Sequence, residues 1–121
     1  MVDPARIKAE VRGRRAENLA ALWLQLKGYK IIERRLKTPF GEIDLMARKG
    51  KLLICIEVKQ RPELETAHAS LHPANLKRIE EAAFFYQGHH DKYQNFDLRF
   101  DAVFILPGLR IHHIKDAWRA Y

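Results

Sequence analysis

The segment Gly41–Gln60, GEIDLMARKGKLLICIEVKQ, decides the fold of this chain, because it predicts a β-hairpin with charged residues inside two apolar strands. Lys49-Gly50 is a turn signal between a strand over Glu42–Arg48 and a strand over Lys51–Gln60. Burying a carboxylate or an ammonium group is costly unless the group is paired or bound to a metal ion. Because this hairpin places several charged groups inside apolar strands, we expect these groups to form a functional site.

The register of this hairpin determines which of its side chains meet. If Arg48 faces Lys51, paired residue numbers sum to 99 and Glu42 lies opposite Glu57. Because paired residues share a face, four charged side chains would then project the same way: Glu42, Asp44, Glu57 and Lys59. Asp44 and Glu57 would be diagonal neighbours, about 7–8 Å apart at the backbone. A shift of one residue would split the group across two faces.

Carboxylates this close raise each other's pKa unless a cation lies among them. Hard oxygen ligands without a Cys or His cluster favour Mg²⁺ or Mn²⁺ over Zn²⁺. We predict Asp44, Glu57 and the Val58 carbonyl as metal ligands, with Glu42 as a further ligand or a nearby support. Such an ion activates water and stabilises charge on a phosphate during displacement, and Lys59 is suited to orient that water or to neutralise the phosphate. The hairpin thus predicts metal-dependent phosphodiester hydrolysis.

Alternating charge on a strand also has a simpler interpretation, which is a solvated face with Glu–Lys pairs. The run Leu52–Val58 argues against it here, because its composition is typical of a strand buried on both faces. Spacing alone leaves both interpretations open.

Asp44, followed after twelve residues by Glu57-Val58-Lys59, resembles the D…(D/E)xK signature of the PD-(D/E)xK nuclease superfamily, with Ile43 where the superfamily has proline. Five segments carry a closer resemblance: Gly13-Arg14-Arg15-Ala16-Glu17, Lys27-Gly28-Tyr29, Gly41-Glu42-Ile43-Asp44-Leu45, Glu57-Val58-Lys59-Gln60-Arg61 and Arg99-Phe100-Asp101-Ala102-Val103. Through them the chain, from about Gly13 to Trp118, is similar to one branch of the superfamily, the YraN-type family of uncharacterised bacterial proteins.

The resemblance implies a restriction-endonuclease-like α/β fold similar to that of Holliday-junction resolvases: a mixed central sheet of about five strands flanked by helices, with an αβββαβ core. It implies Asp44, Glu57 and Lys59 in the catalytic positions and Glu17, from the first helix, near the metal ion. For a lone helical Glu such as Glu17, surface exposure is the alternative. The expected function is an endonuclease acting on branched or structured DNA in repair or recombination. A non-catalytic DNA- or RNA-binding protein that keeps the nuclease fold is the alternative.

The net charge of +7 is concentrated near the N-terminus, since residues 1–37 hold ten basic and four acidic groups, or +6. Such a surface attracts polyanions through phosphate contacts and counterion release, although a solvated basic surface would look the same. DNA is the expected partner and RNA the alternative. In the superfamily that the chain resembles, a polar residue of the second helix often supports the site, which implies a phosphate contact from Lys77 or Arg78. An exposed Lys77–Glu81 ion pair is the alternative interpretation. We predict nucleic-acid contacts from Arg12, Arg14, Arg15, Arg61, Lys77 and Arg78.

The remaining pattern predicts one domain over residues 1–121, with the strand after the second helix parallel to the strand that carries Glu57. Asp101, inside an apolar strand, is interpreted as a buried hydrogen-bonding carboxylate in preference to a functional one. The further elements expected are a helix over Ala5–Lys27, a strand over Tyr29–Leu36, a loop over 62–71, a helix from Pro73 to about Gly88, strands over Leu98–Leu106 and Leu109–Ile114, and a terminal helix over Lys115–Ala120.

Composition sets the remaining expectations. One cysteine, Cys55, excludes an internal disulfide and suits a reducing cytoplasm. No apolar run approaches the ~20 residues of a membrane helix, and residues 1–6 lack the apolar stretch of a signal peptide, so we expect a cytoplasmic protein without membrane contact. Junction cleavage needs two sites, which for a subunit of this size favours a homodimer.

Overall fold

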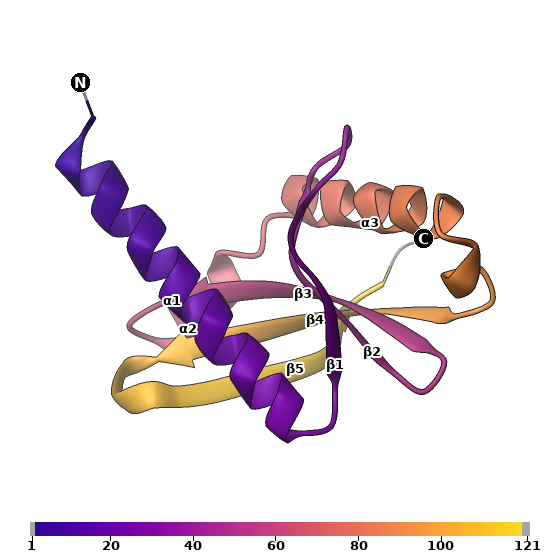
Figure 1. Ribbon diagram of the computed structural model, residues 1–121. Helices are drawn as coiled ribbons and strands as arrows, with labels where there is room; N and C mark the ends of the chain where they lie inside the picture. The colour runs from indigo at the N-terminus through magenta and orange to yellow at the C-terminus, as the bar shows by residue number, and fades with distance from the viewer. Residues whose placement is uncertain (1, 120–121) are drawn as a thin grey trace.

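A five-stranded sheet whose strands lie in chain order, β1-β2-β3-β4-β5, organises the fold (Figure 1). The computed structural model describes residues 2–119. Its helices are α1 (Pro4–Leu26), α2 (Leu64–Ala69), α3 (Pro73–Gly88) and two 3₁₀ turns, η1 (Asp91–Tyr93) and η2 (Pro107–Leu109). Its strands are β1 (Lys30–Lys37), β2 (Glu42–Lys49), β3 (Leu52–Gln60), β4 (Asp97–Leu106) and β5 (Arg110–Trp118).

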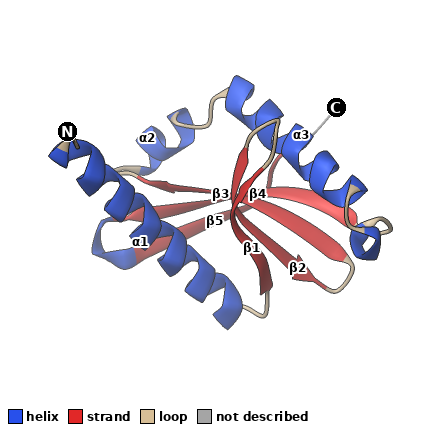
Figure 2. Cartoon of the chain, turned by 45° about the horizontal axis from the view of Figure 1, so that its top comes forward, coloured by secondary structure: helices blue, strands red, loops and turns tan. Residues whose placement is uncertain are grey.

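The sheet is mixed, because β3 and β4 are parallel while the other neighbouring pairs are antiparallel. Alternate residues of β2 and β3 face two separate cores. Ala47 and Ile54 pack against α1, whereas Met46 and Leu53 pack against α3. The helices therefore cover opposite faces of the sheet (Figure 2). This confirms the predicted α/β class and αβββαβ order, including the parallel strand after the second helix.

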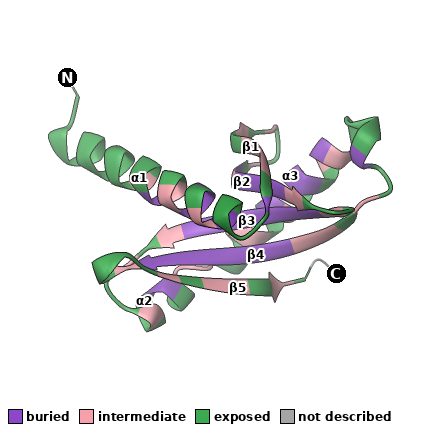
Figure 3. Ribbon diagram, turned by 60° about the horizontal axis from the view of Figure 1, so that its bottom comes forward, coloured by how far each residue is buried: buried purple, intermediate pink, exposed green. Residues whose placement is uncertain are grey.

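Helix α1 begins where the sequence predicted. Oδ1 of Asp3 accepts a hydrogen bond from the Ala5 amide at 3.0 Å, and Pro4 takes the first helical position, where its missing N–H leaves no donor unsatisfied. Gly28, with φ of +92°, ends the helix because the left-handed conformation carries no steric cost for glycine. The first half of α1 is exposed and extends past the edge of the sheet (Figure 3).

The hairpin register differs from the prediction by two residues. Lys49 pairs with Leu52 and the ladder continues to Leu45–Ile56, so paired numbers sum to 101. The reason is the turn, in which Gly50 adopts the positive φ (+61°) that the first position of a tight hairpin loop favours. Glu42 is therefore not opposite Glu57, and that prediction is wrong. A shift of two preserves the side-chain alternation, so the shared face of the charged residues is retained.

Two other segments depart from the expectations. Residues 62–71, expected as a loop, contain α2, whose Ala67 is buried in a small core with Ala102 and Phe104. The terminal helix predicted over Lys115–Ala120 is wrong, because β5 continues to Trp118, which pairs with Phe100 across a bulge and stacks on its ring. Ala120 lies outside the described residues. No helix in residues 2–119 is long and apolar enough to cross a membrane.

Candidate active site

A cleft of about 280 Å³ lies between the first half of α1 and the C-terminal end of β3, and Asp44, Glu57 and Lys59 of the hairpin line it. We call it the carboxylate cleft. It is lined by Ala9, Arg12, Gly13, Ala16, Glu17, Asp44, Glu57, Val58, Lys59, Gln60 and Arg61.

Asp44 reaches this cleft because the β2–β3 ladder stops just before it. Leu45–Ile56 is the last backbone pair, and the next amide along β3 that could bond to β2, that of Val58, donates instead to Oδ2 of Asp44 at 2.8 Å. A side-chain acceptor thus replaces a ladder bond. The Asp44 carboxylate is thereby directed towards β3.

Glu57 is the buried carboxylate of the cleft, with 6% of its surface exposed. Its Oε2 accepts a hydrogen bond from Nδ2 of Asn75 on α3 at 3.0 Å, and its Oε1 lies 3.9 Å from Nζ of Lys59. The two faces of the sheet therefore contribute jointly, since α1 supplies cleft walls while α3 holds the acid in place. The structure brings together Asp44, Glu57 and Lys59.

Burial raises the pKa of Glu57 to about 9, and the hydrogen bond and negative charge of Asp44 act in the same direction. The Lys59 ammonium and the Asn75 amide lower the pKa and offset part of this rise. Near neutral pH Glu57 therefore holds a proton in the absence of a cation. A divalent cation replacing this proton would restore the charge of Glu57. The donor chemistry, hard carboxylate oxygens in a partly buried cleft, fits Mg²⁺ or Mn²⁺.

Glu17 and Glu42, predicted as further ligands, are engaged elsewhere. Glu17 lines the cleft, but its Oε1 lies 2.6 Å from Nε of Arg35. Glu42 is exposed and lies 3.9 Å from Nζ of Lys37. Within residues 2–119, no three Asp, Glu, His or Cys side chains are grouped to hold a metal ion. Asp44 and Glu57 therefore form the carboxylate part of the site, and ligation by Glu17 would require its ion pair to open.

The predicted nucleic-acid contacts separate into two groups. Arg12 and Arg61 line the carboxylate cleft, and Arg14 and Arg15 lie on the exposed part of α1 beside it. Lys77 and Arg78 are exposed on α3 and do not line the cleft. The backbone of Arg78 instead approaches Gly41 so closely that a Cβ at Gly41 would lie 3.3 Å from its carbonyl oxygen, which explains the glycine before β2.

Asn75 and Arg35 are site residues that the sequence analysis missed. Asn75 could have been found, because counting back one turn from the buried Ile79 along the apolar stripe of α3 reaches it directly. Arg35 carried no such signal. It has a positive φ of 50° within β1, beyond the bulge between Ile31 and Glu33, and local sequence does not encode where such a side chain points.

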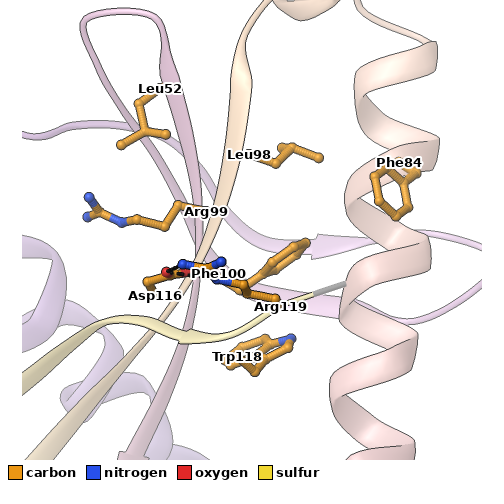
Figure 4. Close-up of a pocket in the computed structure, with 8 residues that line it drawn as sticks. All are labelled: Leu52, Phe84, Leu98, Arg99, Phe100, Asp116, Trp118 and Arg119. Carbon is orange, nitrogen blue, oxygen red and sulfur yellow. Dashed lines mark hydrogen bonds and ion pairs between the residues drawn. The ribbon is translucent and has the colours of Figure 1, made fainter. Parts of the chain in front are cut away.

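A different hollow lies at the other end of β3. It has a volume of about 430 Å³ and walls from the strand ends and α3 (Figure 4). It is lined by Leu52, Phe84, Leu98, Arg99, Phe100, Asp116, Trp118 and Arg119, none of which belongs to the predicted site. Its mainly apolar walls offer no pair of carboxylates comparable to Asp44 and Glu57.

Residues 16–105, which include Glu17, Asp44, Glu57 and Lys59, match the uncharacterised protein family UPF0102. The chain belongs to this family. It is 49% identical over 107 residues to a UPF0102 protein of Parvibaculum lavamentivorans, covering 88% of this chain and 80% of the relative. It is 44% identical over 116 residues to a UPF0102 protein of Bartonella bacilliformis, covering 96% of this chain and 95% of the relative. UPF0102 is the YraN-type family, so the predicted family membership is confirmed.

Proposed function

We propose that this UPF0102 protein is a metal-dependent endonuclease that hydrolyses DNA phosphodiester bonds, with Asp44, Glu57 and Lys59 as catalytic residues. The observation that carries the proposal is the meeting of two carboxylates and an ammonium in one cleft, with Glu57 buried and 3.9 Å from Lys59. Buried titratable groups with strongly shifted pKa values concentrate at functional sites. The resemblance of these residues to the D…(D/E)xK signature supports the same function.

Asp44 and Glu57 would hold the Mg²⁺ or Mn²⁺ ion, with the Val58 carbonyl as a further ligand. The cation would supply charge neutralisation for the phosphate and activation of the attacking water. Asn75 positions Glu57 through its hydrogen bond, and the Val58 amide positions Asp44. Both acids are thus held in place before a ligand arrives, which lowers the reorganisation needed on binding.

Lys59 has the role of a cation placed beside the reacting phosphate. Its ammonium is partly exposed in the cleft and tethered by Glu57, so it can orient water or stabilise charge on the phosphate oxygens. Arg12 and Arg61 line the same cleft and would bind the neighbouring phosphates of the strand. Arg14 and Arg15, on the exposed first half of α1, would extend this contact outwards.

Branched or structured DNA in repair or recombination is the proposed substrate. Cleavage of a four-way junction requires two sites, which a homodimer would supply. We propose the cytoplasm as its location, where the single free thiol of the buried Cys55 would stay reduced.

The test is a cleavage assay with Mg²⁺ or Mn²⁺ on duplex, single-stranded, flap and four-way DNA and on structured RNA. Wild type should cut at least one DNA substrate, and Glu57→Ala and Lys59→Met should abolish cutting. Glu81→Gln, which removes an exposed acid on α3, should cut like wild type. Cleavage that persists in Glu57→Ala would reject this site. Salt-dependent binding without cutting on every substrate would instead indicate a binding protein, and cutting of RNA alone would indicate an RNA-processing enzyme.

A further inference from the structure

A second polar hollow lies at the C-terminal end of α1, away from the carboxylate cleft. Its volume is about 400 Å³. All the residues that line it are aromatic or basic: Trp23, Lys27, Tyr29, Lys49, His113 and Lys115. Among the described residues no Asp or Glu lines this hollow, which we call the lysine pocket.

The aromatic walls of the lysine pocket are held by a buried carboxylate beneath them. Asp101 is fully buried, and its Oδ2 lies 2.8 Å from Nε2 of His113 and 2.8 Å from Nη2 of Arg99. The same Arg99 nitrogen donates to the Tyr29 hydroxyl at 3.1 Å. The edge of the His113 ring meets Trp23, with ring centroids 5.3 Å apart. The walls are therefore fixed by hydrogen bonds and ring contacts, as in a preformed binding site.

Two of the three ammonium groups lie over this aromatic surface, and Lys115 lines the same hollow. Nζ of Lys27 is 5.1 Å from the ring centroid of Trp23, and Nζ of Lys49 is 4.8 Å from that of Tyr29. Nζ of Lys49 also donates to the Lys27 carbonyl at 3.3 Å, which keeps it at the end of α1. Like charges gathered without a carboxylate repel one another. An anion in the pocket would remove this repulsion.

We propose that the lysine pocket binds a phosphate of a nucleic-acid strand and so forms a second contact for the substrate of the carboxylate cleft. The choice of polyanion rests on the proposed function. Phosphate is a tetrahedral anion that point-charge lysines bind, and the aromatic walls provide stacking surfaces for the attached nucleoside. The wider chemistry of the pocket, basic and aromatic with a fixed floor, is that of single-strand binding grooves.

Helix α1 connects the two sites. Gly13 lines the carboxylate cleft and Trp23 lines the lysine pocket, and ten helical residues span about 15 Å at 1.5 Å per residue. About four base pairs along a duplex, or a short stretch of single strand, cover this distance. One substrate can therefore occupy both sites, with α1 as the spacer.

The test measures binding of single-stranded DNA in EDTA, where no cutting occurs, by fluorescence anisotropy across a range of salt concentrations. The pocket variant is Lys27→Gln/Lys49→Gln/Lys115→Gln. The matched control, Lys30→Gln/Lys51→Gln/Lys92→Gln, removes the same charge from exposed lysines that do not line the pocket. The pocket variant should flatten the slope of log K against log salt by about 0.7 units, the value for one lost phosphate contact on a single strand. The control should change the slope by clearly less.

Arginine replacements at the same three lysines keep the positive charge, so the slope of log K against log salt should stay that of wild type. This variant shows whether the effect of the glutamine variant comes from the lost charge or from a folding defect. In a Trp118→Phe background Trp23 is the sole tryptophan of the chain. Its fluorescence should then respond to a mononucleotide and, at lower concentration, to an oligonucleotide that spans both sites. Equal slopes for pocket and control variants would overturn the inference, as would an oligonucleotide that binds no tighter than the mononucleotide. If wild type cuts no substrate but the pocket variant still flattens the slope more than the control, the nuclease proposal fails and the pocket proposal stands, so the two proposals fail separately.

Discussion

Oδ2 of Asp44 lies 2.8 Å from the amide nitrogen of Val58, so an acid of β2 is bonded to the strand that carries Glu57. This bond replaces a backbone pair at the point where the β2–β3 ladder ends. It brings the second carboxylate close enough to raise the pKa of the buried Glu57. The end of the ladder thus places Asp44 where it adds to the rise in the pKa of Glu57 that burial causes.

Replacing Glu57 with Gln should stabilise the metal-free protein at neutral and alkaline pH. Burial and Asp44 raise the pKa of Glu57 from 4.5 to about 9 in the folded protein. Between these values unfolding releases a proton, so the stability of wild type falls as pH rises, by up to about 1.4 kcal/mol per pH unit from this group. Urea denaturation across this pH range should show that the free energy of unfolding falls less steeply with pH for Glu57→Gln than for wild type. Below pH 4.5, where Glu57 is protonated in both the folded and the unfolded state, the two proteins should have the same pH dependence.

The control for that measurement is Glu81→Gln, which removes an exposed acid. It should leave the pH dependence of wild type unchanged. If the free energy of unfolding of Glu57→Gln falls with pH as steeply as that of wild type, another group holds the proton.

The grouping of Asp44, Glu57 and Lys59 could be predicted from sequence because it depends on the two-residue period of strands. Any even shift in register leaves the charged residues of the two strands on one face. The error of two residues in the pairing therefore did not change the predicted grouping. The exact partners could not be predicted, because they depend on which residue adopts the positive φ in the turn. Gly50 decided this, and a Lys-Gly-Lys sequence is compatible with either position.

Contacts between distant segments explain what the sequence analysis missed. Trp118 continues β5 because it stacks on Phe100, a contact that overrides the helix-like composition after Lys115. Asn75 meets Glu57 only because α3 packs across the sheet face. Local pattern reports periodicity, whereas these contacts are set by how separate elements dock.

Added Mg²⁺ should raise the melting temperature of wild type more than that of Asp44→Asn. A ligand that binds only the folded state stabilises it by about 2.7 kcal/mol at one hundred times its Kd. Because the cation displaces the proton of Glu57, the stabilisation should grow as pH rises towards about 9. Differential scanning fluorimetry with and without Mg²⁺ measures both effects. Equal shifts in wild type and Asp44→Asn would count against a cation at this position.

Asn75→Ala should slow cleavage by about tenfold to a hundredfold, because a hydrogen bond to a charged group contributes about 1.5–3 kcal/mol. The Asn75 amide lowers the pKa of Glu57, so its loss should also move the pH profile of kcat/KM to higher pH. Asn95→Ala, at an exposed position, serves as the control. A rate loss without the shift in pH profile would assign Asn75 a packing role only.

Asp101→Asn should destabilise the protein by about 3–5 kcal/mol at neutral pH, because it breaks a buried ion pair. Burial opposes the charged form of Asp101, yet hydrogen bonds from His113, Arg99 and the Asp116 amide outweigh it and hold the pKa below 3.8. The contribution is therefore present above pH 3.8 and is lost as pH falls through the lowered pKa. In urea denaturation, the difference in the free energy of unfolding between wild type and Asp101→Asn should narrow in that acidic range. The control Asp97→Asn, at an exposed position, should keep a free energy of unfolding close to that of wild type at every pH. A gap that is small at neutral pH would contradict the role of Asp101 as the anchor of this network.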